Sequence, residues 1–360
     1  MSQSHTPRIW IMAGGTGGHI VPGLAVAQIL KEEGSQVSWL GNPQRMEGQL
    51  VAPTGIPMIA VQFAAVRGKG LWRKLVTPFA LAAWTLRVWI RMLRQRPDVV
   101  LGMGGYVSVP GGLAAWLARV PIVLHEQNAV AGMSNRLLAR LAATVLSGFP
   151  DTLKNATWVG NPVRQSMLEL PAPARRYGQR TGPLRVLVVG GSLGAAALNT
   201  VVPQAIAQLN PENRPIVTHQ SGASHLDVLK ANYEAVGVQA ECVAFIDDMA
   251  QAMGEADLMI CRAGAMTVAE VAAAGVAALF VPFPFAVDDH QTANAQHLVD
   301  HEGALLRDQK QLTPEWLAQW LSEQTRDNLT NMAQQAQQLA KPEAGKEIAQ
   351  QCLKLWRRKQ

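Results

Sequence analysis

One local pattern recurs along the chain: a short apolar run, a glycine-rich turn and then a stretch with helical periodicity. It appears first at residues 8–34, where RIWIM is followed by AGGTGGHIVPGLAVAQILKEEG. It returns at residues 97–124 around LGMGGYVSVPGGLAAWLARV, and again from residue 185, where RVLVV precedes GGSLGAAALNTVVPQAIAQL. Strand–helix alternation at this spacing is typical of parallel sheets joined by right-handed crossovers. We therefore predict an α/β fold with two Rossmann-like, doubly wound parallel-sheet domains that face a cleft.

The length of 360 residues also favours two domains over one. We place the boundary near GNPVR at residues 160–164, because the proline-rich, basic stretch at residues 169–183 changes the composition as a linker does. The predicted N-terminal domain is 1–164, and the predicted C-terminal domain is 165–342. Residues 343–360 are expected to form a helix with a basic end that returns to the first domain.

Composition excludes several classes of protein. Hydrophobic residues make up 48% of the chain and charged residues only 16%, which excludes a disordered chain. The three cysteines, without a C-x-x-C pair, form neither a disulfide framework nor a structural zinc site, and they fit a reducing cytoplasm. The N-terminus lacks the basic segment and uninterrupted apolar run of a secretory signal.

Positive charge is concentrated in the first half of the chain. Residues 1–164 carry 16 Lys and Arg against 6 Asp and Glu, whereas residues 165–360 carry 16 against 20. Most of the excess lies in residues 63–96, where no acidic residue occurs. Eight basic residues alternate there with four aromatic ones: Arg67, Lys69, Arg73, Lys74, Arg87, Arg91, Arg94 and Arg96 with Trp72, Phe79, Trp84 and Trp89.

Two interpretations of the 63–96 stretch remain open. Its uncharged run, residues 75–86, is shorter than the roughly 18–20 residues that a membrane-spanning helix needs. The stretch therefore either docks on an anionic membrane surface or forms a helix that packs on the sheet with a solvated basic face. Nucleic acid is not expected as a partner, because no recognised binding module accompanies the charge.

The glycine turns predict phosphate binding. One such turn is a weak signal, but three in one chain favour phosphate or pyrophosphate at helix N-termini. None matches G-x-x-x-x-G-K-[ST], so a P-loop kinase or ATPase is not expected. None is a clean G-x-G-x-x-G with an acid about twenty residues on, so a nicotinamide dehydrogenase becomes a distant alternative. The chain has no D-x-D motif, which disfavours a metal-held diphosphate and favours the helix N-terminus after GGSLGA.

Eight motifs follow one another along nearly the whole chain: AGGTGGHIVPGLAVA (13–27), GMGGYVSVPGGLAA (102–115), HEQNAVAGMSNR (125–136), GNPVR (160–164), GGSLGA (190–195), FIDDM (245–249), CRAGAMTVAE (261–270) and DDHQTANA (288–295). In this order they resemble the MurG family of bacterial enzymes, glycosyltransferase family 28. The resemblance implies a GT-B fold and metal-independent, inverting transfer of GlcNAc from UDP-GlcNAc to the MurNAc 4-hydroxyl of lipid I. The product would be lipid II for peptidoglycan synthesis, made peripherally at the cytoplasmic face of the inner membrane, with cell-wall and division proteins as candidate partners.

The resemblance also implies a donor site, mainly on the second domain. Ser192 would bind the diphosphate, the Ile246 backbone the uracil, and Glu270 the ribose hydroxyls, which a carboxylate accepts well. The remaining donor contacts implied are the run Ala265, Met266, Thr267, Val268 and Ala269 for diphosphate and ribose, Gln291, Asn128 and Arg164 for GlcNAc or its phosphates, and Thr16, Gly17 and Gly18 from the first domain. Ala263 and Phe285 depart from the Ser and His that are frequent at these positions in the family.

The acceptor diphosphate would face the first-domain turns, with Gly14, Gly15, Gly104, Gly105 and Tyr106 as the implied contacts. Direct inversion needs a base near the acceptor hydroxyl. We expect His19 to be this base, with Glu126 as its competitor or its orienter. The simpler interpretation is that His19 caps a helix or binds phosphate, and that His125 and His290 are structural or position the substrate.

Two further functions stay open. A UDP-GlcNAc 2-epimerase of the same fold would consume donor without acceptor and would need no lipid-facing patch. A non-catalytic UDP-sugar-binding module that recruits cell-wall or division proteins would bind donor without turnover. No cofactor and no metal are expected in the leading interpretation.

Overall fold

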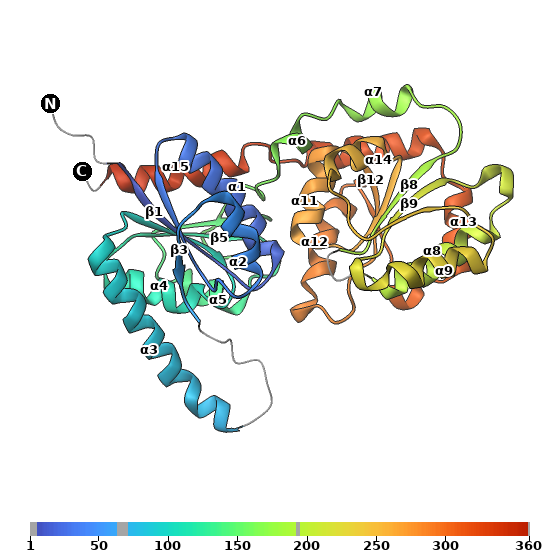
Figure 1. The fold of residues 1–360 in the computed structure, drawn as a ribbon. Coiled ribbons are helices and arrows are strands. Elements are labelled where there is room, and N and C mark those ends of the chain that lie inside the picture. Colours follow the sequence, from blue (N-terminus) through green and yellow to red (C-terminus); the bar gives the residue numbers. More distant parts are fainter. Residues whose placement is uncertain (1–5, 63–70, 192–194, 359–360) are drawn as a thin grey trace. The chain divides into compact units, whose positions relative to one another are not determined.

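The computed structural model describes residues 6–62, 71–191 and 195–358, with the backbone alone for residues 71–76 and 287. The chain divides into two compact units, each built on one sheet (Figure 1). The first unit comprises Met1–Val163 and Lys341–Gln360, and the second comprises Arg164–Ala340. The final segment of the chain therefore belongs to the first unit.

The first unit contains a seven-stranded sheet with strand order β3-β2-β1-β4-β5-β6-β7, and every pairing in it is parallel. Its strands are β1 (Arg8–Ala13), β2 (Gln36–Gly41), β3 (Met58–Ala60), β4 (Val99–Gly104), β5 (Ile122–Glu126), β6 (Thr144–Ser147) and β7 (Thr157–Trp158). Its helices are α1 (Gly17–Glu32), α2 (Met46–Val51), α3 (Leu71–Gln95), α4 (Ser108–Leu117), α5 (Met133–Leu138) and α15 (Ala344–Arg357), with a short 3-10 turn η1 (Ala52–Thr54).

Alternation along β1 places a separate core on each face of this sheet. Ile9 and Ile11 face the core formed with α1 and α15, whereas Trp10 and Met12 face the core formed with α3 and α4. Both faces are covered, so β1 is buried along almost its whole length. Helix α15 packs against α1, where Gly345 lies against Ile29.

The second unit contains a six-stranded parallel sheet with strand order β10-β9-β8-β11-β12-β13. Its strands are β8 (Arg185–Val189), β9 (Ile216–Gln220), β10 (Glu241–Val243), β11 (Leu258–Cys261), β12 (Ala277–Phe280) and β13 (Leu305–Leu306). Its helices are α6 (Gln165–Leu168), α7 (Pro173–Gly178), α8 (Ala196–Gln208), α9 (Leu226–Ala235), α10 (Met249–Glu255), α11 (Ala265–Ala274), α12 (His290–Val299), α13 (Pro314–Ser322) and α14 (Arg326–Gln338). Short 3-10 turns occupy Pro211–Asn213, Ala223–His225, Val287–Asp289 and Gln309–Gln311.

The stretch at residues 169–183, which its composition suggested as a linker, is instead packed into the second unit. It contains α7, whose Tyr177 is buried and donates its hydroxyl to the carbonyl oxygen of Asp257 at 2.9 Å. The Arg176 guanidinium donates to carbonyls at the ends of α10 and α11, including those of Gly254 and Gly275. Cations are favoured at helix C-termini, so the basic residues here serve as caps rather than as a solvated spacer.

Candidate functional site

The first two glycine turns meet at the carboxyl ends of the adjacent strands β1 and β4. Gly105 has a φ of +86°, and a Cβ atom on it would lie 2.0 Å from the carbonyl oxygen of Gly14. The two turns therefore touch backbone to backbone, which only glycine allows. This contact explains Gly105 by packing, and it lies at the edge where ligands of such sheets bind.

A buried carboxylate that the sequence did not reveal organises these turns. Glu47 of α2 has no exposed surface and accepts hydrogen bonds from the Tyr106 hydroxyl at 2.5 Å and the Asn42 amide at 3.3 Å. The Gly15 amide lies 3.5 Å from its second oxygen. Burial, followed by the contact with Glu47, raises the pKa of Tyr106 well above its ordinary value. Tyr106 is therefore a neutral phenol whose proton is already committed to Glu47.

His19 lies in the first turn of α1 and is half-buried. Its Nδ1 atom is 3.0 Å from Oε1 of Gln127, a residue that follows β5. A Cβ atom on Gly104 would lie 3.0 Å from both Nδ1 and Cε1 of the imidazole, and Gly104 has a φ of +103°. The glycine at this position therefore makes room for the histidine ring.

Glu126 does not take the place beside His19. It ends β5 with 1% of its surface exposed, and its carboxylate accepts hydrogen bonds from the loop that follows. The donors are the Asn128 amide at 2.9 Å, the Gly132 amide at 3.0 Å and Nδ2 of Asn135 at 2.9 Å. Both oxygens are engaged, so this geometry favours a role for Glu126 in holding the loop and disfavours it as a base.

In the second unit, the side-chain amide of Gln220 connects the turn after β8 to the loop after β10. Gln220 is 3% exposed, and its Nε2 atom donates at 3.2 Å to the carbonyl oxygens of Gly191 and Ala244. Ile246, the expected uracil contact, lies two residues beyond Ala244 and is half-buried. Ser192, the expected diphosphate contact, lies outside the described residues.

Helix α11 starts directly after the buried strand β11. Its N-cap, Gly264, is extended, makes no side-chain cap and is followed by a first turn without acidic residues. The amide groups of Ala265, Met266 and Thr267 therefore begin the helix with the partial positive charge that favours an anion. This is the run that the resemblance assigns to the diphosphate and ribose.

Two expected donor residues lie together near this helix. Nε of Arg164 is 4.0 Å from Oε1 of Glu270, and the side chains are 50% and 14% exposed respectively. Burial raises the pKa of Glu270, and the positive charge of Arg164 opposes the shift. The pair places one cation and one hydrogen-bond acceptor together at α11, where Glu270 lies in the second turn.

Gln291 of α12 lies on the neighbouring helix and has one end of its amide already fixed. Its Oε1 accepts the Phe283 amide at 2.9 Å, which leaves Nε2 as the end that donates to a ligand. Nδ2 of Asn294 donates to the carbonyl oxygen of Ala263 at 3.2 Å and so ties α12 to the loop before α11. Phe285 is 81% exposed, so it is available at the surface but holds no position in the core.

The predicted residues thus fall into two groups, one at the carboxyl edge of each sheet. Glu47, Gln127 and Gln220 join them as residues to which the sequence assigned no role. Glu47 and Gln220 lie outside the eight motifs, and Gln127 lies inside HEQNAVAGMSNR without a signal of its own that separates it from its neighbours. Over residues 6–62, 71–191 and 195–358, no group of three or more His, Cys, Asp or Glu is arranged to hold a metal ion.

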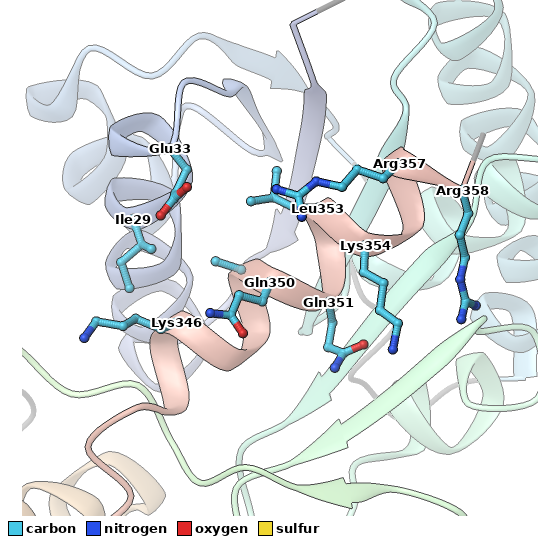
Figure 2. A pocket seen from close by; sticks show the side chains of 10 residues that line it. Ile29, Glu33, Lys346, Gln350, Gln351, Leu353, Lys354, Arg357 and Arg358 are labelled. Carbon is cyan, nitrogen blue, oxygen red and sulfur yellow. The ribbon is translucent and has the colours of Figure 1, made fainter. Parts of the chain in front are cut away.

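A separate groove of about 610 Å³ lies in the first unit along α15, and it includes no predicted site residue. Ile29 of α1 and Glu33, the residue that caps its C-terminus, form one side of it (Figure 2). The other side is formed by α15 residues, with Lys354, Arg357 and Arg358 toward its C-terminal end (Figure 2).

Helix α3 has one buried and one exposed apolar side. Val88 and Met92 pack into the core of the sheet. We name the exposed apolar and basic side chains of α3 and of the successive helices α4 and α5 the α3 patch. It consists of Phe79, Leu86, Arg87, Ile90, Arg91, Leu93, Arg94, Trp116, Leu117, Met133 and Leu137. In Figure 1 the N-terminal part of α3 extends beyond the sheet of its unit.

Helix α3 packs on the sheet through one side, as the second interpretation of the basic stretch expects, whereas docking on an anionic membrane surface stays a prediction. The side chains of Arg67, Lys69, Trp72, Arg73 and Lys74 lie outside the described residues. Within the described part of the chain, no helix combines the length and apolarity needed to cross a membrane.

Comparison with known families identifies the class of protein. Residues 9–147 match the glycosyltransferase family 28 N-terminal domain, and residues 185–352 match the glycosyltransferase family 28 C-terminal domain. The chain belongs to glycosyltransferase family 28.

Full-length relatives define the type more narrowly. A protein of Bordetella petrii is 58% identical over 98% of this chain and 99% of its own length, and one of Bordetella pertussis is 60% identical over 98% and 99%. Both are named UDP-N-acetylglucosamine--N-acetylmuramyl-(pentapeptide) pyrophosphoryl-undecaprenol N-acetylglucosamine transferase.

Solved structures confirm the expected GT-B fold. The crystal structure of Acinetobacter baumannii MurG is 44% identical, with a TM-score of 0.85 over 97% of this chain and 99% of that chain. The glycosyltransferase VinC is 17% identical with a TM-score of 0.64, covering 98% of this chain and 100% of that one. The UDP-GlcNAc 2-epimerase of Neisseria meningitidis is 10% identical with a TM-score of 0.67, covering 96% and 99%, so it shares the fold alone.

Proposed function

We propose that this enzyme transfers GlcNAc from UDP-GlcNAc to the MurNAc 4-hydroxyl of lipid I, with inversion, and so makes lipid II for peptidoglycan. The observation that carries the proposal is the similarity over 98% of the chain to transferases of that name. The epimerase alternative is supported only by a shared fold at 10% identity.

The second unit supplies the chemistry expected of the donor site. The N-terminus of α11 and the guanidinium of Arg164 provide positive charge for the diphosphate, so departure of UDP needs no metal ion. Glu270 provides the acceptor for the ribose hydroxyls, and the free end of the Gln291 amide donates to the sugar or its phosphates. The backbone near Ile246, joined to the Gly191 turn through Gln220, serves the uracil.

The first unit supplies the acceptor side. We assign the diphosphate of lipid I to the paired turns at Gly14–Gly15 and Gly104–Gly105, and the removal of the hydroxyl proton to His19. Glu126 keeps the loop that carries Asn128 in place through its hydrogen bonds to that loop.

We further propose that the α3 patch holds the enzyme on an anionic membrane surface at the cytoplasmic face. On α3 the large apolar side chains of Phe79, Leu86, Ile90 and Leu93 are exposed on the helix that also carries Arg87, Arg91 and Arg94, and Phe79 is 77% exposed. Such amphipathic surfaces lie in the interfacial plane of a bilayer without crossing it. This placement gives the enzyme access to a lipid-linked acceptor.

The testing experiment incubates purified protein with UDP-GlcNAc and a short-chain lipid I analogue in EDTA, and follows UDP release and the disaccharide. Acceptor-dependent disaccharide in EDTA is the expected result. Donor consumption without acceptor would establish the epimerase instead, and donor binding without turnover would establish a recruitment module.

A further inference from the structure

Four groups of the first unit form a continuous row of hydrogen bonds that starts at His19. Nδ1 of His19 lies 3.0 Å from Oε1 of Gln127, and Nε2 of Gln127 lies 3.1 Å from Nδ1 of His125. Nε2 of His125 lies 2.9 Å from the carbonyl oxygen of Gly160. Gln127 is 1% exposed and His125 is fully buried, so water does not substitute for these partners.

The carbonyl of Gly160 sets the direction of the row. A carbonyl oxygen only accepts, so Nε2 of His125 carries a hydrogen and donates it. Burial lowers the pKa of His125 to about 4, so the ring is neutral near pH 7 and its Nδ1 has no hydrogen. Nδ1 of His125 therefore accepts, and the group that faces it is the NH2 end of Gln127.

A second contact fixes the same orientation of the Gln127 amide independently. Nε2 of Gln127 also donates to the backbone carbonyl of His125 at 3.2 Å. Reversing the amide would place its oxygen against that carbonyl oxygen and against the bare Nδ1 of the ring. Oε1 of Gln127 consequently faces His19, and the contact of 3.0 Å requires a hydrogen on Nδ1 of His19.

We propose that Gln127 is a positioning residue that holds His19 in the tautomer with the hydrogen on Nδ1 and the lone pair on Nε2. This inference rests on the proposed function, in which the lone pair on Nε2 takes the proton of the acceptor hydroxyl. The arrangement parallels the carboxylate that orients histidine in hydrolytic triads, but with a neutral amide. A neutral amide fixes the orientation of the ring without placing a negative charge beside it.

Direct evidence comes from the protonation of the imidazole nitrogens in the whole protein. The chain is labelled with 15N-histidine, the His19 signals are assigned by their absence in a His19→Ala variant, and two-bond 1H–15N correlations are recorded near pH 7.5. The expected pattern is a protonated Nδ1 and an unprotonated Nε2. The opposite pattern, or an even mixture, overturns the proposal whether or not the protein has transferase activity.

Kinetics of two Gln127 variants give a second test. In Gln127→Leu the ring loses its partner, so kcat should fall by about 10- to 100-fold, the usual effect of removing a supporting partner of a functional histidine, while the KM for UDP-GlcNAc stays unchanged. In Gln127→Glu the carboxylate favours the charged ring, so the acid limb of the kcat profile should move to higher pH.

The matched control is Gln49→Glu, the same substitution at an exposed position of α2 in the same unit. It should leave the pH profile in place. Circular dichroism and thermal unfolding confirm that the variants are folded, and if they are not, the nitrogen shifts of the unmodified chain decide. An unmoved acid limb in folded Gln127→Glu overturns the proposal, whereas absence of turnover in the unmodified chain overturns the proposed function and leaves the tautomer assignment standing.

Discussion

Nε of Arg164 and Oε1 of Glu270, a residue in the second turn of α11, lie 4.0 Å apart, with the carboxylate side chain 14% exposed and the arginine side chain 50% exposed. The arginine is too solvated to offset the burial of the carboxylate fully, and the net effect is a raised Glu270 pKa. The enzyme therefore keeps a carboxylate whose charged form is disfavoured by burial at the position where the donor ribose is expected.

Glu270→Gln should separate stability from binding. The pKa of Glu270 is higher in the folded protein than in the unfolded chain, where it is 4.5. The protonated carboxyl therefore contributes fully to the free energy of unfolding below pH 4.5. The contribution is lost as the pH rises through the folded pKa. The variant should thus unfold at an equal or higher temperature than the unmodified chain at pH 8, yet bind UDP-GlcNAc about 10- to 100-fold more weakly. Calorimetric titration and thermal melts at pH 5 and 8 check this, and unchanged affinity would contradict the ribose assignment.

Asp257→Asn should be the most destabilising conservative change in the second unit. Asp257 is fully buried and accepts from Arg180 at 2.6 Å, from Arg326 at 3.2 Å and from the Arg185 amide at 2.9 Å. Removing one partner of a buried ion pair costs about 3–5 kcal/mol. Glu343→Gln is the matched control, since its pair with Lys346 is more than half exposed and is worth under about 1 kcal/mol. Urea unfolding measures both, and equal midpoints would refute the role given to burial.

His19→Ala should reduce kcat by about 10²- to 10⁴-fold at saturating acceptor, the usual contribution of a general base. Glu126→Gln should affect the loop at residues 127–132, so its main effect is expected on KM for substrates and on thermal stability. Steady-state kinetics with a soluble acceptor analogue distinguish the two variants. A His19→Ala enzyme that turns over at the unmodified rate would exclude this histidine as the base.

Reversing the charge of Arg87, Arg91 and Arg94 should abolish binding to vesicles that contain anionic lipid. Each basic residue near such a surface contributes about 1 kcal/mol, so removal of three charges alone weakens binding by about two orders of magnitude. Activity on a water-soluble acceptor analogue should remain. The same reversal at Lys354 and Arg357 of α15 and at its C-cap Arg358 is the control, because it changes the net charge equally on the opposite face of the sheet. Equal loss in both variants would show that net charge, and not the α3 patch, drives binding.

The sequence alone was enough to predict the two-sheet architecture, whereas the roles given to the site residues stay predictions. Strand-like runs followed by glycine turns at residues 13–18, 102–106 and 190–195 specified two parallel α/β sheets, because glycine is needed where a strand passes closely into a helix. Such signals depend only on residues close in the sequence, so they can be recognised without the structure. The stretch at residues 169–183 shows the limit: its composition suggests a linker, but the buried Tyr177 and the caps formed by Arg176 make it part of a core.

Only the tertiary structure decided which side chains meet. Parallel strands bring successive loops to one edge of the sheet, but the register and the side of each strand determine which neighbour faces which. His19 contacts Gln127, which is 108 residues away, and not the adjacent Glu126, because neighbouring side chains at a strand end point to opposite sides. Tyr106 donates a hydrogen bond to Glu47, which is 59 residues away and belongs to none of the motifs. The sequence by itself thus determined the family and the positions of the glycine turns. The packing of the first unit determined that Gln127 is the partner of His19.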